Sequence, residues 1–502
     1  MAGLEHLLAA LTPLNLAFAL FGVVAGTVIG AIPGLTATMA VAVLVPLTFA
    51  MPTSSALILM GAIYTGAIYG GAYSAILLNT PGTPSAIATT FDGYPLAKKG
   101  DGDYAITVAC LASVVGGLIG AVALMTLAPP LSLVALAFGP VEYFWLAIFG
   151  LSLIAALAEG SLLKGMAGGA LGLILSCIGV AEVAGDVRLT FGSQTLVSGI
   201  QIVAALIGLF CVPVLIDLVA KPGHHLNVDG GSKGFRLGEA VAYLWRDKLN
   251  AVRSSVIGTI VGILPGAGGS IASLVSYSEA RRTAKKGQVY GKGEPGGIIA
   301  SESANNATVG GGFIPTLVLG IPGTPPDAVI LGALLVQGVR TGPSLFTNQG
   351  EIVYTFIWGL ILATILMLPT GLLIGRYAYR TIIALPKALL VPAIAFMTII
   401  GAYAIRNNVS DVVIMIALGA MGWVLARFGF TASPIVLGLI LGPIAESGFV
   451  QAWTIGRATD NLAGMFFGRP ISIAIILFTL FTLASPFFLA RLQKMKERAR
   501  AD

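Results

Sequence analysis

"LLNTPGTPSA" (residues 77–86) and "VLGIPGTPPDA" (residues 318–328) place the same Pro-Gly-Thr-Pro motif inside two long apolar segments. A proline in a helix interior removes a backbone hydrogen bond and destabilises the helix by about 3 kcal/mol or more. The paired motifs therefore predict two apolar helices that are broken at these positions. Such breaks either belong to kinked helices that only pack, or they form a binding site.

The composition of the chain indicates that its solvent is lipid. Of its 502 residues, 56% are hydrophobic and only 10% are charged, whereas soluble domains carry about 25% charged residues. No Asp, Glu, Lys or Arg lies between His6 and Phe91. Uncharged apolar stretches long enough to cross a bilayer recur along the chain, so we predict an all-α polytopic membrane protein with about 10–13 membrane segments.

Two halves of the chain share one order of motifs. "GTVIGAIPGLTAT" (Gly26–Thr38) matches "GTIVGILPGAGGS" (Gly258–Ser270), and "GGAYSAILLNTPGTP" matches "GGGFIPTLVLGIPGTP" further along each half. Glycines at every fourth position lie on one helical face in both copies and favour close helix packing. The ordered set predicts two structural repeats, at roughly residues 10–220 and 250–445.

Basic residues mark the cytoplasmic side of a membrane protein and so predict its topology. Only four of the 28 Lys and Arg residues precede position 221, whereas segment 221–253 and the tail 491–502 are strongly basic. If both basic segments are cytoplasmic, the repeats have opposite orientations, as in secondary transporters with broken helices. We therefore predict inverted repeats and a cytoplasmic C-terminus.

This topology predicts four regions of the chain. They are a first transmembrane repeat (1–220), a basic cytoplasmic linker (221–253), a second transmembrane repeat (254–450), and an extra helix with a basic tail (451–502).

Two segments around the start of the second repeat leave alternatives open. Ser254–Tyr277 is long enough to span a membrane, but basic residues flank both of its ends. It forms either a re-entrant hairpin that turns at "LPGAGG" or an ordinary span. In the linker, Leu237, Val241 and Trp245 share one helical face, which fits a helix on the membrane surface as well as an ordinary loop helix.

The breaks are suited to binding ions or a substrate. Within hydrocarbon, non-helical backbone is tolerated only where it is buried in protein or lines a wet cavity. The N-termini of half-helices attract an anion, and freed carbonyls at C-terminal ends coordinate cations such as Na⁺. The hydroxyl and amide side chains at the breaks are those of Asn79, Thr80, Thr83, Ser85 and Thr324.

The most polar neighbourhood within an apolar region is "SESANNATVGGG" (residues 301–312). Polar side chains near the membrane interior are costly and are usually functional. Glu302, Asn305 and Asn306 could together coordinate Na⁺, whereas Glu302 could instead mark the cytosolic end of a helix. Asp92 and Asp327 follow the two Pro-Gly-Thr-Pro motifs, and they belong either to the site or to the membrane interface.

Catalytic constellations are not recognisable in the sequence. The glycine-rich stretches "GAGGS" and "GKGEPGG" do not match the phosphate-binding GxxxxGK[ST] pattern. The three histidines do not combine with acidic residues into a metal site or a triad, and the three cysteines stand singly. We therefore expect no enzymatic activity, no cofactor and no nucleic-acid partner.

Four stretches together resemble the large membrane subunit of the tripartite tricarboxylate transporter family: "GAIPGLTATMAVAVLVPLTF", "LLNTPGTPSAIATTFDGYPLAKKG", "ESANNA" and "PTLVLGIPGTPPDAVILGALL". The similarity covers nearly the whole chain. It implies a permease of the bacterial inner membrane that works with a small membrane subunit and a periplasmic solute-binding protein. It also implies uptake of citrate-like carboxylates, driven by a cation gradient that is usually Na⁺.

The resemblance further implies that the Pro-Gly segments form the binding site. The residues carried over are Pro33, Gly34, Thr36, Thr38, Asn79, Thr80, Gly82, Thr83, Ser85, Gly266, Gly268, Gly269, Ser270, Asn305, Asn306, Gly323 and Thr324. The candidate Na⁺ ligands are Asn79, Asn305 and Asn306, together with backbone carbonyls.

We therefore expect a binding-protein-dependent symporter for tricarboxylates or related anions that works by alternating access. A transporter of another small solute and an uncoupled channel or scaffold subunit are the alternatives. The paired broken segments favour an elevator-like motion over rocking.

Overall fold

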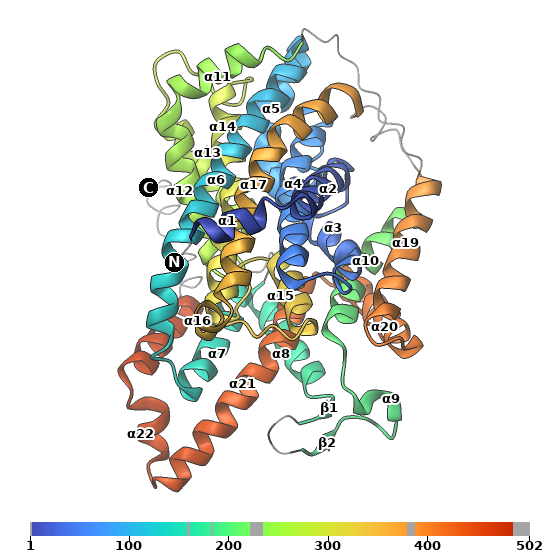
Figure 1. Cartoon of the computed structure of the whole chain (residues 1–502), viewed down its shortest axis with the longest axis vertical. Helices are drawn as coiled ribbons and strands as arrows, with labels where there is room; N and C mark the ends of the chain where they lie inside the picture. Colours follow the sequence, from blue (N-terminus) through green and yellow to red (C-terminus); the bar gives the residue numbers. More distant parts are fainter. Residues whose placement is uncertain are drawn as a thin grey trace, which may run out of the picture. The chain divides into compact units, whose positions relative to one another are not determined.

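A computed structural model describes residues 3–157, 161–181, 183, 185–220, 234–378 and 387–484 (Figure 1). This part of the chain is almost entirely helical, and its one sheet is a two-stranded antiparallel hairpin of β1 (Gly179–Val180) and β2 (Val187–Arg188). The predicted all-α class is confirmed. The basic tail and residues 221–233 of the linker lie outside the described residues.

The elements of the first half, in chain order, are α1 (Leu4–Ala10), α2 (Pro13–Ala31), α3 (Ala37–Leu44), η1 (Val45–Thr48), α4 (Thr53–Leu78), η2 (Pro84–Ala86), α5 (Ile87–Leu96), η3 (Ala97–Asp101), α6 (Gly102–Ala135), α7 (Pro140–Leu157), α8 (Leu162–Ser176), β1, β2, α9 (Gln194–Val197) and α10 (Ile202–Ala220). Those of the second half are α11 (Leu237–Arg246), α12 (Lys248–Ile263), α13 (Gly268–Arg282), α14 (Pro295–Leu319), α15 (Pro325–Val336), α16 (Pro343–Asn348), α17 (Gly350–Leu373), η4 (Ile374–Ala378), α19 (Lys387–Ala404), α20 (Val409–Arg427), α21 (Ala432–Ala458) and α22 (Leu462–Phe467).

Seven helices among the described residues are long and apolar enough to cross a membrane. Six shorter apolar helices accompany them, including Ala37–Thr48, Pro325–Val336 and Pro470–Ala484. A helix that crosses the hydrocarbon core needs roughly 20 residues. The predicted range of about 10–13 membrane segments is therefore reached only when the shorter helices, which are too short to cross alone, are counted with the seven long ones.

Two compact units divide the chain: unit 1 (Met1–Leu133 and Leu206–Ala420) and unit 2 (Val134–Ala205 and Met421–Asp502). Each unit takes parts of both sequence halves. All the Pro-Gly breaks predicted from the repeat lie in unit 1. The division into units is therefore not the division into repeats.

Unit 2 is built around α21, which packs against α7 and α8. Its fully buried Glu142 accepts a hydrogen bond from Ser472 (2.8 Å) and pairs with Arg469 (3.1 Å). Arg188 of β2 forms a two-bonded ion pair with Glu446 of α21, with the shorter contact at 2.7 Å. The buried Glu142 is thus paired, as burial of a charge requires.

Unit 1 contains the same order of elements twice. In the first repeat α2, a break and α3 precede α4, a break, η2 and α5; in the second, α12, a break and α13 precede α14, a break and α15. Helix α2 packs along α4, and α12 packs along α14 (Figure 1). The repeated motifs of the sequence therefore correspond to repeated structure.

Segment Ser254–Tyr277 forms the hairpin that its flanking charges predict. Arg253, near the start of α12, donates a hydrogen bond to the hydroxyl of Thr283, just after α13 (2.6 Å). The two ends of the segment therefore lie together, and the chain reverses between Ile263 and Gly268. The alternative of one straight span is wrong.

The linker helix α11 presents an apolar face that the described protein does not cover. Leu237, Val241 and Trp245, spaced four residues apart, are 45%, 48% and 72% exposed. An amphipathic helix with an uncovered apolar face is typical of a membrane surface, and the position of α11 on the membrane stays a prediction.

The glycines spaced four residues apart allow the helices of each repeat to pack in backbone contact. A Cβ on Gly26 would lie 2.2 Å from the carbonyl oxygen of Ile63, and a Cβ on Gly258 would lie 2.2 Å from that of Ala304. No side chain fits at either position, because real Cβ atoms do not approach other atoms this closely. The predicted packing role of these glycines is confirmed.

The glycine of each Pro-Gly-Thr-Pro motif packs against the same pair of helices. A Cβ on Gly82 would lie 2.3 Å from the Gly30 oxygen and 2.9 Å from Gly71 Cα. A Cβ on Gly323 would lie 2.5 Å from the Gly262 oxygen and 2.8 Å from Gly312 Cα. Three glycines thus meet in each repeat, and we call each meeting point a glycine contact.

Replacing Gly323 by alanine is expected to destabilise the protein by about 1–3 kcal/mol or more, because two helices must separate to admit the methyl group. The measurement is the melting temperature of the detergent-solubilised protein. Gly238→Ala is the matched control, since nothing lies within 4 Å of its Cβ position on α11. Equal melting temperatures for Gly323→Ala and the unaltered protein would contradict the glycine contact.

Candidate binding site at the helix breaks

The breaks of the two repeats have matching backbone conformations. Helices α4 and α14 end in left-handed residues, Asn79 (φ 55°) and Gly320 (φ 71°), at the same distance before Pro-Gly-Thr-Pro. Gly34 and Gly266, each directly after a proline, have φ angles of 91° and 84°. Positive φ angles favour glycine, so the backbone conformation explains why glycine occupies positions 34 and 266. At positions 82 and 323 the reason is the close packing of the neighbouring backbone.

The broken segments of one repeat pack against those of the other. Helix α3 contacts α15, and α13 contacts both η2 and α5. We call the contact between α3 and α15 the first junction, and that between α13 and η2 the second junction. The pattern is reciprocal, because the segment after the first break of one repeat contacts the segment after the second break of the other.

The first junction contains capped helix N-termini and a buried carboxylate. Thr36 caps α3 by accepting a hydrogen bond from the Met39 amide (3.1 Å). Thr324 and Asp327 cap α15 reciprocally, and the Thr324 hydroxyl donates to Asp327 Oδ2 (2.5 Å). Because that bond uses the only hydroxyl proton of Thr324, the Tyr64 hydroxyl must be the donor in its 2.8 Å contact with Thr324.

Asp327 has a free oxygen at this junction. The residue is fully buried, and its Oδ1 has no hydrogen-bond partner among the described residues. Space for its carboxylate comes from Gly312, where a Cβ would lie 2.2 Å from Asp327 Oδ2. A buried carboxylate oxygen without a partner is unfavourable unless a cation or a proton meets it.

The second junction contains an unpartnered amide against an uncapped helix N-terminus. Asn305 of α14 is fully buried, and neither of its amide atoms has a hydrogen-bond partner in the described structure. A Cβ on Gly269, in the first turn of α13, would lie 2.4 Å from Asn305 Oδ1 and 2.8 Å from Ser85 Cβ. Asn305, Gly269 and Ser85 therefore meet at one point.

Hydroxyl groups complete the second junction. Ser273 of α13 donates to the backbone carbonyl of Ser85 (2.7 Å), and the Ser85 and Thr83 hydroxyls lie 3.0 Å apart. No side chain caps the N-terminus of α13 or of η2. Their amide groups keep the partial positive charge of a helix N-terminus. The second junction therefore presents hydrogen-bond donors and partial positive charge, whereas the first junction presents a carboxylate oxygen without a partner.

The other predicted site residues differ in burial. Thr38 and Asn306 are buried, Pro33, Gly268 and Ser270 are half-buried, and Gly34, Asn79 and Thr80 are exposed. Asn306 donates to the Glu302 carbonyl (3.2 Å), and its own Oδ1 is unpartnered. The three expected Na⁺ ligands thus comprise two buried neighbours, Asn305 and Asn306, and the exposed Asn79.

Glu302 lies inside α14 and not at its end. It is fully buried and accepts hydrogen bonds from Thr89 (2.5 Å) and Ser113 (3.0 Å). The alternative of a carboxylate at the cytosolic end of a helix is therefore wrong, because α14 begins at Pro295 and runs on past Glu302. Two hydroxyl donors already satisfy this carboxylate in part.

Asp92 holds the second repeat to the first. It is fully buried within the protein. Its Oδ1 accepts hydrogen bonds from the amides of Gly291, Gly293 and Glu294, each at 2.8 Å, and its Oδ2 accepts one from the Tyr277 hydroxyl (2.8 Å). A side chain of α5 thereby fixes both α13 and the loop that leads into α14.

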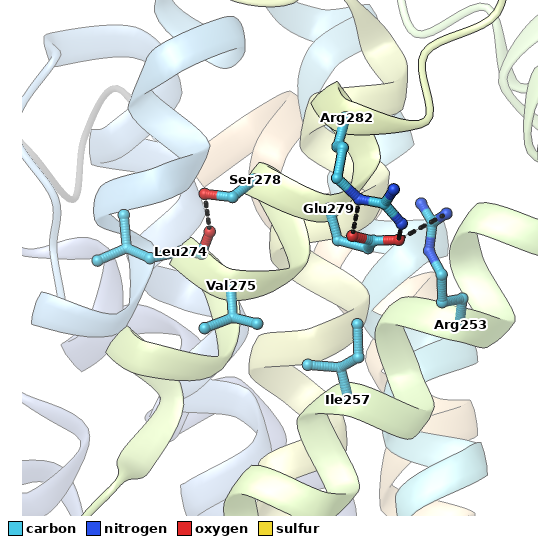
Figure 2. A pocket seen from close by; sticks show the side chains of 7 residues that line it. All are labelled: Arg253, Ile257, Leu274, Val275, Ser278, Glu279 and Arg282. Atoms are coloured by element: carbon cyan, nitrogen blue, oxygen red, sulfur yellow. Dashed lines mark hydrogen bonds and ion pairs between the residues drawn. The ribbon is translucent and has the colours of Figure 1, made fainter. Parts of the chain in front are cut away.

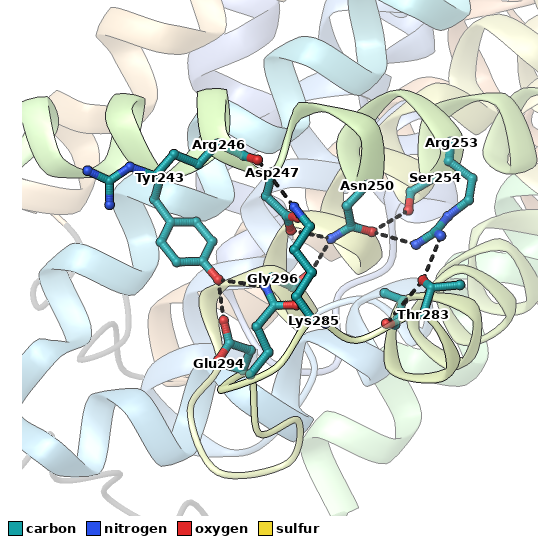
Figure 3. A network of polar contacts seen from close by, with 12 residues as sticks. Tyr243, Arg246, Asp247, Asn250, Arg253, Ser254, Thr283, Lys285, Glu294 and Gly296 are labelled. Atoms are coloured by element: carbon teal, nitrogen blue, oxygen red, sulfur yellow. Dashed lines mark hydrogen bonds and ion pairs between the residues drawn. The ribbon is translucent and has the colours of Figure 1, made fainter.

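A polar network secures the other side of the same loop (Figure 3). Asn250 of α12 donates to Asp247 (2.8 Å) and to the Gly296 carbonyl (2.9 Å), and Lys285 pairs with Asp247 (3.4 Å). The Tyr243 hydroxyl donates to Glu294. The start of α14, and with it the position of Asn305, is therefore held from α5, α11 and α12.

Asp92→Ala is expected to release the loop before α14, because three backbone amides and one hydroxyl lose their acceptor. Asp92→Asn is the matched control: its carbonyl oxygen can face the three amides while its NH₂ group donates to Tyr277. The measurement is the rate of tryptic cleavage after Lys292 in the purified protein. We expect faster cleavage in Asp92→Ala, and equal rates in the two variants would contradict the anchoring role.

Two residues of the junctions were missed in the sequence, Tyr64 and Ser273. Tyr64 stands seven residues before Gly71, as Asn305 stands seven before Gly312. Aligning the repeats through these glycines would have placed a polar group at both junctions. Ser273 lies one turn after Gly269 on α13, and no local signal distinguishes it from other helical serines.

Comparison with known proteins gives one family and two relatives. The profile of the tripartite tricarboxylate transporter TctA family matches residues 16–437. An uncharacterized 52.8 kDa protein in the TAR-I ttuC' 3' region of Agrobacterium vitis is 36% identical over 479 residues, covering 93% of this chain and 92% of the relative. An uncharacterized protein in the TAR-II ttuC' 3' region of the same organism is 38% identical over 223 residues, 44% of this chain and 89% of the relative. No solved structure matches.

Proposed function

Because this multi-pass membrane protein belongs to the tripartite tricarboxylate transporter TctA family, we propose that it is the permease subunit of a cation-coupled importer of tricarboxylates or related organic anions. It works in the inner membrane with a small membrane subunit and receives its substrate from a periplasmic binding protein. The coupling ion is Na⁺, and the mechanism is alternating access.

The buried, unpartnered amide of Asn305 is the observation that carries this proposal. A buried amide that lacks partners destabilises a protein unless something binds it. Its surroundings, an uncapped helix N-terminus and the Ser85 and Thr83 hydroxyls, supply hydrogen-bond donors and positive partial charge. A substrate carboxylate at the second junction would accept hydrogen bonds from the NH₂ group of Asn305 and from the hydroxyls.

The first junction supplies the complementary cation site. Asp327 Oδ1 is buried without a partner, because the Thr324 amide and hydroxyl both donate to Oδ2. Tyr64 donates to the Thr324 hydroxyl and does not contact the carboxylate. Broken helices of secondary transporters coordinate Na⁺ through such oxygens and the freed backbone carbonyls nearby. We therefore assign Asp327 as a Na⁺ ligand at the first junction.

The spacing of the two junctions gives a physical basis for coupling. Asn305 at the second junction and Gly312 beside Asp327 stand two turns apart on α14, which is about 10 Å. At this separation an ionised Asp327 repels a substrate carboxylate by about 1.7 kcal/mol at an effective dielectric constant of 20. Na⁺ at Asp327 removes this repulsion, so its binding strengthens anion binding by roughly a factor of 17.

The reciprocal contacts support the proposed inverted repeats, because a pseudo-two-fold axis generates this kind of pairing. All four breaks belong to unit 1. This supports an elevator-like cycle in which one unit carries the whole site. In this topology the linker, the extra helix and the tail place the C-terminus in the cytoplasm.

The proposal is tested by uptake of labelled citrate into vesicles that contain this chain and its small membrane subunit, with ligand-loaded binding protein outside. We expect accumulation against the citrate gradient only while a Na⁺ gradient is imposed. Equilibration that ignores the Na⁺ gradient would indicate a channel or scaffold and would overturn the coupled mechanism. Accumulation of another carboxylate in place of citrate would retain the mechanism and change the substrate.

Single variants should separate the two junctions. Asn305→Ala is expected to raise the apparent KM for the carboxylate about tenfold or more, because a hydrogen bond to a charged group is lost. Asp327→Asn is expected to raise the Na⁺ concentration needed for half-maximal uptake. Asn348→Ala, at the exposed end of α16, is the control and should change neither constant. Identical effects of the first two variants on both constants would contradict separate sites.

A further inference from the structure

A groove between α12 and α13 lies apart from both junctions. It has a volume of about 550 Å³ and is lined by Arg253, Ile257, Leu274, Val275, Ser278, Glu279 and Arg282 (Figure 2). Charged residues form one end of the groove and apolar residues form the other. No part of the transport proposal uses these side chains.

The charged end carries one net positive charge. Arg282 holds Glu279 through two hydrogen bonds of 2.7 Å each, and Arg253 approaches the same carboxylate at 3.8 Å (Figure 2). The hydrogen bonds from Arg282 lower the pKa of the Glu279 carboxyl, so it is ionised at neutral pH. Two guanidinium groups against one carboxylate leave a single charge uncompensated.

Arg253 also keeps donor capacity. Its guanidinium donates to Thr283 (2.6 Å) and Asn250 (3.1 Å), but its buried Nε has no partner in the described structure. The Arg253 side chain lines the groove beside Glu279, so its positive charge acts on an acceptor that enters the groove. Phosphate oxygens suit this position, because arginine binds them through parallel hydrogen bonds.

The apolar end of the groove continues into the outer face of α12. Val252, Val256 and Ile260 follow one another along this face and are 48%, 45% and 56% exposed. Such a stripe on a membrane protein contacts acyl chains. Trp245, 72% exposed on α11 and stacked against the Lys248 ammonium, marks the membrane interface near the start of α12.

We propose that this groove binds one anionic phospholipid, with its phosphodiester against Arg253 and Arg282 and its acyl chains over Ile257, Leu274 and Val275. The single negative charge of a phosphodiester matches the net charge of the groove. The apolar lining selects a lipid over a soluble phosphate, since a soluble ion leaves these side chains uncovered. Basic grooves between membrane helices are established binding sites for anionic headgroups.

Binding of palmitoyl-oleoyl phosphatidylglycerol to the delipidated, detergent-solubilised protein tests the proposal, with bound lipid counted by native mass spectrometry across a titration. Arg253→Gln and Arg282→Gln are each expected to weaken binding about tenfold or more through the loss of charge-assisted hydrogen bonds. Arg281→Gln is the matched control, because this exposed neighbour on α13 removes the same charge but does not line the groove.

Glu279→Gln is expected to change the affinity for phosphatidylglycerol in the opposite direction to the arginine variants. Removing the carboxylate raises the charge of the groove and frees Arg282, so this variant should bind phosphatidylglycerol more tightly than the unaltered protein. Phosphatidylethanolamine and glycerol 3-phosphate are expected to bind more weakly than phosphatidylglycerol in every variant. Equal binding of either of them, equal weakening by Arg281→Gln, or weaker binding by Glu279→Gln would overturn the proposal.

Discussion

The structure of unit 1 depends on one constraint: backbone polar groups at a break inside an apolar region need partners from the protein itself. The glycine contacts meet this requirement by bringing three backbones together. At the second repeat the Gly266 amide donates to the Gly323 carbonyl (2.8 Å), so one break supplies a partner for the other. Side chains larger than hydrogen at these positions would separate the groups that satisfy each other.

The two junctions have the same backbone plan and opposite electrostatics. At the first, Thr36 and the Thr324–Asp327 pair use the amides of the helix N-termini and add a carboxylate. At the second, no side chain caps the amides, and the polar side chains that meet there, including Asn305 and Ser273, are neutral. In the proposed mechanism, duplication of one motif followed by a change of capping residues produces an anion site and a cation site on one scaffold.

The sequence predicted those features that have a local physical signature. Proline and glycine locate the breaks, four-residue glycine spacing locates the helix contacts, and basic residues at both ends of Ser254–Tyr277 reveal the hairpin. The pairing of α3 with α15 could not be predicted, because it arises from tertiary contacts alone. Glu302 and Asp92 were ambiguous for the same reason: a carboxylate in an apolar region looks identical in sequence whether it meets water or buried hydroxyls and amides.

The glycine contacts also limit how unit 1 can move. Where helix backbones touch directly, no flexible side chains lie between them to absorb sliding or rotation, and any relative displacement produces atomic overlap or opens a void. In each repeat the break loop must therefore travel with the two helices that it contacts, α2 and α4 in the first repeat and α12 and α14 in the second. In the proposed transport cycle, strain is then concentrated in the connections that lead out of these helix pairs, and the backbone geometry of each break is the same at the start and at the end of the movement.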